Sequence, residues 1–157
     1  MKQILTGAIT LVFFLATTPF ALATDYDIEL VVPEGKKSVE TDAVLRISDK
    51  NFQIMIEKPK FKEHEKSFDF KSLKLADYSY SKKPMLSGGG AVATALLVGF
   101  IFALPFLFIK KKNHWLTVQS EKEFAVMKLD GSNYRAIVAE FKTHGVEVKE
   151  VKEEKGE

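Results

Sequence analysis

A run of nineteen residues without a charge, 91–109, divides this chain of 157 residues. A helix needs about 20 apolar residues to cross the hydrocarbon core of a bilayer, so the run predicts a membrane-embedded segment. The cluster of Lys110, Lys111 and Lys112 follows it directly, as is typical of the flank of such a helix. The path of residues 87–109 decides whether the parts of the chain on either side of them can share one fold.

The first 23 residues predict a secretory signal peptide. Lys2 supplies a positive start, residues 4–16 are apolar, and Ala21 and Ala23 form a small-x-small cleavage site. An uncleaved N-terminal anchor is the alternative, which the short apolar stretch and the helix-breaking Pro19 disfavour. The sequence therefore predicts an exported membrane protein of the cell envelope, with its main domain outside the cytoplasm.

Composition excludes several classes of site. The chain has no cysteine, so disulfides, thiolate metal sites and cysteine nucleophiles are absent. Residues 24–85 hold 12 Lys plus Arg against 12 Asp plus Glu, and residues 110–157 hold 10 against 9. Neither part is a polycation, so a nucleic-acid partner is not expected.

The part before the hydrophobic segment, 24–86, is rich in period-two alternation, which predicts half-buried antiparallel strands. Residues 49–51 are turn formers that predict a hairpin, and residues 58–66 are a further connection. An earlier strand over 26–32 ends at the turn signal of residues 33–35. The alternating apolar positions are Ala43, Leu45, Ile47, Phe52, Ile54, Ile56, Phe68, Phe70, Leu73 and Leu75.

The part after it, 110–151, predicts a hairpin of strands 114–119 and 124–129, followed by a helix. Residues 130–132 offer N-cap candidates, and Gly145 predicts the end of the helix. The apolar residues Tyr134, Ile137, Val138 and Phe141 have helical spacing and form one stripe. Val146, Val148 and Val151 alternate with charged residues, which predicts a last strand, and residues 152–157 form a charged tail.

Two topologies follow. If residues 91–109 cross the bilayer once, the chain is a single-span protein with a small β-rich outer domain and a cytoplasmic tail, which acts as a complex subunit or sensor. If the segment enters and leaves on the same side, the two parts can join into six or seven antiparallel strands with one covering helix. Gly99 and Pro105 allow the bend that this second path needs. A piece as small as 110–157 rarely folds alone, so we prefer the joined fold.

Four runs in residues 41–145 together resemble bacterial proteins with a pleckstrin-homology-like (GRAM-like) domain: TDAVLRISDKNFQIMIEK, KSFDFKSLKLADYSYSKKP, KKKNHWLTVQ and KLDGSNYRAIVAEFKTHG. The resemblance implies a seven-stranded, strongly bent barrel of antiparallel strands, interrupted by the hydrophobic segment and capped by a helix over 134–141. Such domains commonly bind lipids or proteins and are not catalysts. The phosphoinositide pocket of eukaryotic members needs basic residues on the first hairpin. Here only Lys50 stands there, beside Asp49, so that specificity does not carry over.

No catalytic set stands out, so no enzyme and no cofactor is expected. The three histidines, His64, His114 and His144, lack metal-ligand spacing and are expected at the surface. Alternating acids at 25, 27 and 29 lack the glycine and distal glutamate of a calcium loop. Tyr78 and Tyr80 share one strand face, which favours core or interface packing over a ligand platform.

The candidate site lies at the membrane interface. Lysines flank the hydrophobic segment on both sides, which fits contact with anionic lipid headgroups, and a tryptophan nearby is typical of an interface anchor. An ordinary stop-transfer flank is the alternative. The residues are Lys82, Lys83, Lys110, Lys111, Lys112 and Trp115. The expected partners are the lipid bilayer, its anionic headgroups and another envelope protein.

Overall fold

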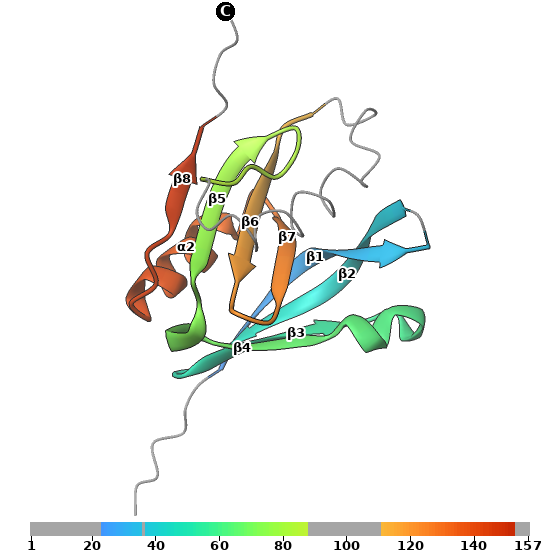
Figure 1. Ribbon diagram of the computed structural model, residues 1–157, viewed down its shortest axis with the longest axis horizontal. Coiled ribbons are helices and arrows are strands. Elements are labelled where there is room, and N and C mark those ends of the chain that lie inside the picture. Colours follow the sequence, from blue (N-terminus) through green and yellow to red (C-terminus); the bar gives the residue numbers. More distant parts are fainter. Residues whose placement is uncertain (1–22, 36, 88–110, 153–157) are drawn as a thin grey trace, which may run out of the picture.

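The computed structural model describes residues 23–35, 37–87 and 111–152, which form one open half-barrel sheet and one α-helix (Figure 1). The predicted signal peptide, the hydrophobic segment 91–109 and Lys110 lie outside the described residues. In the described part of the chain, no helix is both long and apolar enough to span a membrane.

The sheet has eight strands in the order β4-β3-β2-β1-β7-β6-β5-β8. Short 3-10 turns, η1 (Pro59–His64) and η2 (Phe70–Ser72), connect β3 to β4 and β4 to β5, and α2 (Tyr134–Thr143) follows β7. The strands are β1 (Thr24–Glu34), β2 (Lys37–Ile47), β3 (Asn51–Ile56), β4 (Lys66–Asp69), β5 (Leu75–Ser81), β6 (Asn113–Gln119), β7 (Phe124–Leu129) and β8 (Lys149–Val151). The predicted class, mainly β with one C-terminal helix, is confirmed.

The two parts of the chain share this sheet. β7 pairs with β1, with Ile28 opposite Leu129 and Leu30 opposite Met127. β6 pairs with β5 along its whole length, from Gln119 opposite Leu75 to Asn113 opposite Ser81. Residues 82–112 therefore form the connection of an antiparallel β5–β6 hairpin, and the hydrophobic segment lies within that connection.

Alternation places one face of each strand in the core. Phe52, Ile54 and Ile56 of β3 are 0–1% exposed, as the period-two pattern predicted. The pattern was wrong beyond β4, because the chain leaves the sheet at Phe70 and makes a 3-10 turn before β5. The predicted turn at 33–35 also begins later, since Pro33 and Glu34 still pair with β2.

Helix α2 covers the inner face of the sheet. Ile137 and Phe141 are fully buried, and the Phe141 ring lies 4.8 Å from the Phe52 ring and 5.4 Å from the Phe70 ring. Val138, predicted in the same stripe, is only half-buried and faces a groove beside β8. The N-cap is Asn133 rather than a residue of 130–132, and Asp130 instead accepts the backbone N–H of Ser132.

The strand count and the last pairing differ from the expectation of six or seven antiparallel strands. β8 returns from α2 and pairs with β5 in parallel, with Glu150 opposite Tyr78. The crossover through α2 gives β8 the direction of β7, which is also the direction of β5, and a pattern of alternating residues does not indicate this.

Candidate functional site

The end of the β5–β6 pair at Ser81 and Asn113 carries the predicted interface lysines. Lys82 and Lys83 leave β5 at this end, Lys111 and Lys112 enter β6 there, and all four are exposed. We call this end the lysine end. Lys110 lies outside the described residues. Two basic flanks separated by the hydrophobic segment in sequence thus meet at one end of the sheet.

Trp115 has a different setting from the one expected. Its side chain is 0% exposed, and its indole N–H donates a hydrogen bond to the backbone oxygen of Ser81 over 3.1 Å. This bond ties β6 to the last residue of β5. The burial favours a structural role for Trp115 in the lysine end, whereas Lys82, Lys83, Lys111 and Lys112 are exposed.

Residues 82–87, which we call the strap, fold back along β5. The Ser81 hydroxyl donates to the Lys83 backbone oxygen over 2.5 Å, and the Met85 N–H donates to Ser79 Oγ over 3.2 Å. Ser87 then donates its N–H and its O–H to the Asp77 carboxylate, over 2.7 Å and 2.9 Å. The contacts run in order from the end of β5 toward its middle.

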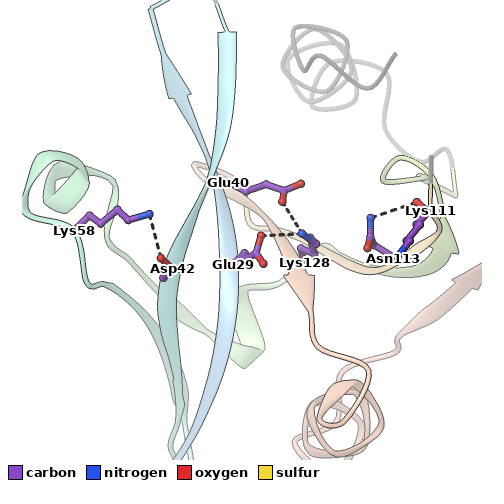
Figure 2. A network of polar contacts seen from close by, with 7 residues as sticks. All are labelled: Glu29, Glu40, Asp42, Lys58, Lys111, Asn113 and Lys128. Carbon is purple, nitrogen blue, oxygen red and sulfur yellow. Dashed lines mark hydrogen bonds and ion pairs between the residues drawn. The ribbon is translucent and has the colours of Figure 1, made fainter. Parts of the chain in front are cut away.

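A polar network lies on the outward face of β1, β2 and β7 (Figure 2). Lys128 Nζ lies 2.9 Å from Glu29 Oε2 and 2.6 Å from Glu40 Oε2, so one ammonium bridges two carboxylates. An exposed pair, Lys58 and Asp42, lies nearby at 3.1 Å. Glu29 stands directly opposite Lys128 in the β1–β7 register, which is why this cluster forms.

The two carboxyls differ in their pKa. Burial, together with a hydrogen bond to Glu29, raises the pKa of Glu40 above its ordinary value despite Lys128. Burial would also raise the pKa of Glu29, but hydrogen bonds from Glu40 and Lys128 outweigh it and lower that pKa. Burial would lower the pKa of Lys128, and the hydrogen bonds to both glutamates raise it instead. The cluster is therefore an ion pair of Lys128 and Glu29 with an additional carboxyl, Glu40, that binds a proton more readily than an ordinary glutamate does.

A groove of about 450 Å³ opens beside this network and reaches the lysine end. Its lining mixes both signs of charge: Asp27, Glu29, Asp42, Lys112, Lys128 and Asp130, with Tyr80 and His114 as ring surfaces. Within the described residues, no three acidic or histidine side chains are placed to hold a metal ion.

His114 stands in a stack of aromatic rings rather than at the surface as expected. Its ring lies 3.8 Å from the Tyr134 ring and 4.6 Å from the Tyr80 ring, and its Nδ1 lies 2.7 Å from the Tyr78 hydroxyl. Burial and the nearby Arg135 lower the pKa of His114, with Asp130 opposing. Burial raises the pKa of Tyr78 to about 12. A neutral imidazole and a protonated phenol thus hold β5, β6 and α2 together.

The tyrosine pair predicted to be core or interface is divided by this arrangement. Tyr78 is half-buried against the core, whereas Tyr80 is 54% exposed. His144 caps the end of α2 and stacks on Phe70 at 4.3 Å. His64 is half-buried on η1, apart from the stack.

Asp77 and the Lys128 network were not predicted from the sequence. Asp77 stands between two inward-facing residues, Ala76 and Tyr78, so alternation alone could have placed it on the outward face. Its burial could not be foreseen, because the strap that covers it is held by hydrogen bonds and carries no periodic signal. Glu29 and Lys128 are separated by 99 positions, and only the register of β1 and β7 brings them together.

No family model matches this chain, and no curated protein matches it. Among solved structures, the chain is similar to the hSac2 domain from the human phosphoinositide phosphatase Sac2, with 8% sequence identity and a TM-score of 0.49. The match covers 85% of this chain and 77% of that chain. A likeness at this level carries no inference about activity or ligand.

Proposed function

We propose that this chain is a non-catalytic, membrane-attached binding or scaffold protein of the cell envelope. Its domain is of the pleckstrin-homology-like kind, built from both parts of the chain, and the hydrophobic segment 91–109 seats it on the bilayer. The observation that carries the proposal is the position of this segment inside the β5–β6 connection, with exposed lysines at the lysine end on both flanks.

The pairing of β5 with β6 favours this proposal over the single-span alternative. A single crossing would put β5 and β6 on opposite sides of the bilayer, and their seven-residue pairing could not form. The pairing of β1 with β7 and the packing of α2 on β3 would be lost with it. A segment that enters and leaves on one side keeps all three.

The curved sheet closed by α2 supports the pleckstrin-homology-like assignment. Hairpins join β1 to β2, β2 to β3 and β6 to β7. Helix α2 follows β7 and packs Ile137 and Phe141 into the open face of the sheet. A scaffold role fits the groove beside the lysine end, whose lining holds four acidic and two basic side chains together with the rings of Tyr80 and His114 as contact surfaces for a partner.

Two measurements test the proposal. Because the chain has no cysteine, Asp49→Cys and Lys122→Cys provide single labels on the two parts, both at exposed positions. A thiol reagent that cannot cross the membrane holding the protein, applied from the outer side of that membrane, should label both cysteines. Labelling of Asp49→Cys alone would refute the joined domain.

Attachment is tested by replacing residues 88–110 with a short Gly-Ser linker. We expect the full chain to stay with membranes after alkaline carbonate washing and the replaced chain to be released while still folded. Release of the full chain would refute the membrane attachment.

A further inference from the structure

Strand β8 forms one edge of the sheet. Among the described residues it pairs with β5 alone, and Figure 1 shows it at the outer side of the sheet. A groove of about 230 Å³ lies between α2 and this strand, so the helix does not close over the edge. Lys149, Glu150 and Lys152 are exposed, and Val151 is half-buried. The free edge of β8 therefore presents backbone N–H and C=O groups that can pair with another strand.

The charges around β8 follow a particular order in the sequence, which is KEVKE over residues 149–153. Charged side chains commonly protect an edge strand, because an incoming strand does not match them. In the opposite direction, however, this run has Glu at each position of Lys, Lys at each position of Glu, and valine again at its centre. The run is therefore complementary to itself in an antiparallel pair.

Symmetry selects the register of such a pair. Two identical antiparallel strands are related by a twofold axis normal to the sheet, so one residue stands opposite its own copy. With Val151 at the axis, Glu150 of each copy faces Lys152 of the other. Lys149 then faces Glu153. With Glu150 or Lys152 at the axis, a charged residue would face its own copy, which is unfavourable.

The other edge strand, β4, has no such match. With Phe68 at the axis, Ser67 would face Asp69, and with Ser67 at the axis, Lys66 would face Phe68. Neither register pairs opposite charges. Self-complementarity is thus a property of β8 and not of the sheet edges in general.

We propose that β8 is a dimerisation edge, at which a second copy of this chain adds its own β8 in antiparallel orientation about a twofold axis at Val151. The two eight-stranded sheets then join into one. The inference goes beyond the scaffold role and does not depend on membrane attachment. It is also compatible with attachment to one bilayer, because a twofold axis normal to the sheet keeps Ser87 of both copies on the same, outward side.

The pairing is small, so the dimer is weak and depends on concentration. Specific, stable interfaces bury about 1,200–2,000 Å² in total, which one pair of short strands does not reach. Backbone hydrogen bonds supply the attraction in an edge pair of this kind. Four Glu–Lys pairs and one valine pair, counted over residues 149–153 of both copies, select the register.

The test uses the full chain in detergent, which has no cysteine of its own. In Val151→Cys the two thiols face each other across the axis, at a Cα separation of about 4.5–5.5 Å that a disulfide spans. Lys149→Cys is the matched control on the same strand and face, because its two copies would lie about 14 Å apart at ~3.4 Å per residue. After mild oxidation we expect several-fold more disulfide-linked dimer from Val151→Cys than from Lys149→Cys.

Charge exchange tests the register. Lys152→Glu in the Val151→Cys chain sets a second glutamate against Glu150 on both sides of the axis, and we expect the yield of linked dimer to fall several-fold. The further change Glu150→Lys restores opposite charges without altering the net charge of the unaltered chain, and it should return the yield close to that of Val151→Cys alone. Lys122→Glu, on the exposed β6–β7 turn, makes the same charge change away from β8 and should leave the yield unchanged.

Equal linkage of Val151→Cys and Lys149→Cys would indicate random collision and overturn the proposal. Failure of the double exchange to restore the yield lost in Lys152→Glu would overturn it as well. Sedimentation equilibrium of the unaltered chain and of the charge variants without the cysteine repeats the comparison, so the result does not depend on the folding of Val151→Cys.

In sedimentation the unaltered chain should dimerise at lower concentration than Lys152→Glu, and a monomer at every concentration reached would refute the dimer. None of these measurements requires a bilayer. Their failure is therefore distinct from a failure of the membrane attachment proposed above.

Discussion

The ring of Phe141 on α2 lies 4.8 Å from the ring of Phe52 on β3, with the planes tilted by 52°. Both rings are fully buried, and the two residues come from the parts of the chain that the hydrophobic segment separates. This contact makes the core a joint product of both parts. Neither β1–β5 nor the β6–β7–α2 portion buries its apolar face without the other.

Phe141→Ala should therefore destabilise the whole domain. Truncating a buried phenylalanine removes transfer free energy and leaves a cavity, which together cost about 3–5 kcal/mol. Denaturant unfolding of the full chain in detergent, followed by Trp115 fluorescence, measures the loss. Lys142→Ala, exposed on the same helix, is the control and should stay within about 0.5 kcal/mol. Normal protease resistance of β2 and β3 in Phe141→Ala would contradict a shared core.

The end of α2 offers a test of backbone conformation alone. Gly145 has φ +80°, and a Cβ built there meets no atom within 4 Å. Gly145→Ala should cost about 1–2 kcal/mol, since an L-residue in the left-handed region is strained. Gly131→Ala is matched, because that site is equally open but lacks a positive φ, and it should be nearly neutral. Equal unfolding midpoints for the two variants would rule out the conformational explanation.

Local periodicity accounts for the elements that were predicted correctly. Strands with one buried face and a helix with one buried stripe leave a signal in any short window of sequence, as in β3 and α2. In these elements every inward position carries an apolar residue, so the spacing of apolar residues along the chain is enough to distinguish a strand from a helix. The prediction that the whole apolar stripe of the helix is buried was wrong at Val138, because the burial of this residue depends on where β8 pairs with the sheet.

The candidate site depends on contacts between residues that are far apart in the sequence. The lysine end exists because β5 pairs with β6 across the hydrophobic segment, and Lys128 meets Glu40 at a separation of 88 positions. Hydrogen bonds of the strap, such as Met85 to Ser79, also depend on a chain reversal that has no periodic pattern. The lysines could be predicted from their places beside the hydrophobic segment, whereas the contact of Asp77 with Ser87 depends on the folded structure.

Removal of the Lys128 ammonium should expose the repulsion between Glu29 and Glu40. Lys128→Met leaves two neighbouring carboxyls in a partly buried site, and we expect a loss of about 1–3 kcal/mol at pH 7. Acid should reduce this loss. The pKa of Glu40, already raised by burial and by Glu29, marks a group whose protonated form suits the fold, so its contribution to stability is present at low pH and lost as pH rises.

Thermal unfolding of Lys128→Met at pH 7 and near pH 5 would measure both effects. Lys122→Met, on the exposed β6–β7 turn, removes the same charge without a partly buried partner and should change little at either pH. A loss in Lys128→Met that is equal at both pH values would argue against a proton shared by the two glutamates.

The aromatic stack around His114 predicts an acid-sensitive domain. Burial and Arg135 lower the pKa of His114 in the folded chain, so the unfolded chain binds the proton first, near the ordinary value of 6.5. The free energy of unfolding is therefore full above pH 6.5 and falls as pH drops below it. Protonation would also place a cation beside Arg135.

Unfolding free energies measured from about pH 7.5 to pH 5.5 give the slope of this pH dependence, within the range where histidines titrate. His114→Phe keeps a ring between Tyr80 and Tyr134 but cannot titrate, so its slope should be flatter than that of the unaltered chain. The difference between the variant and the unaltered chain separates His114 from Glu40, whose raised pKa acts in the opposite direction, and identical slopes would exclude His114 as the source.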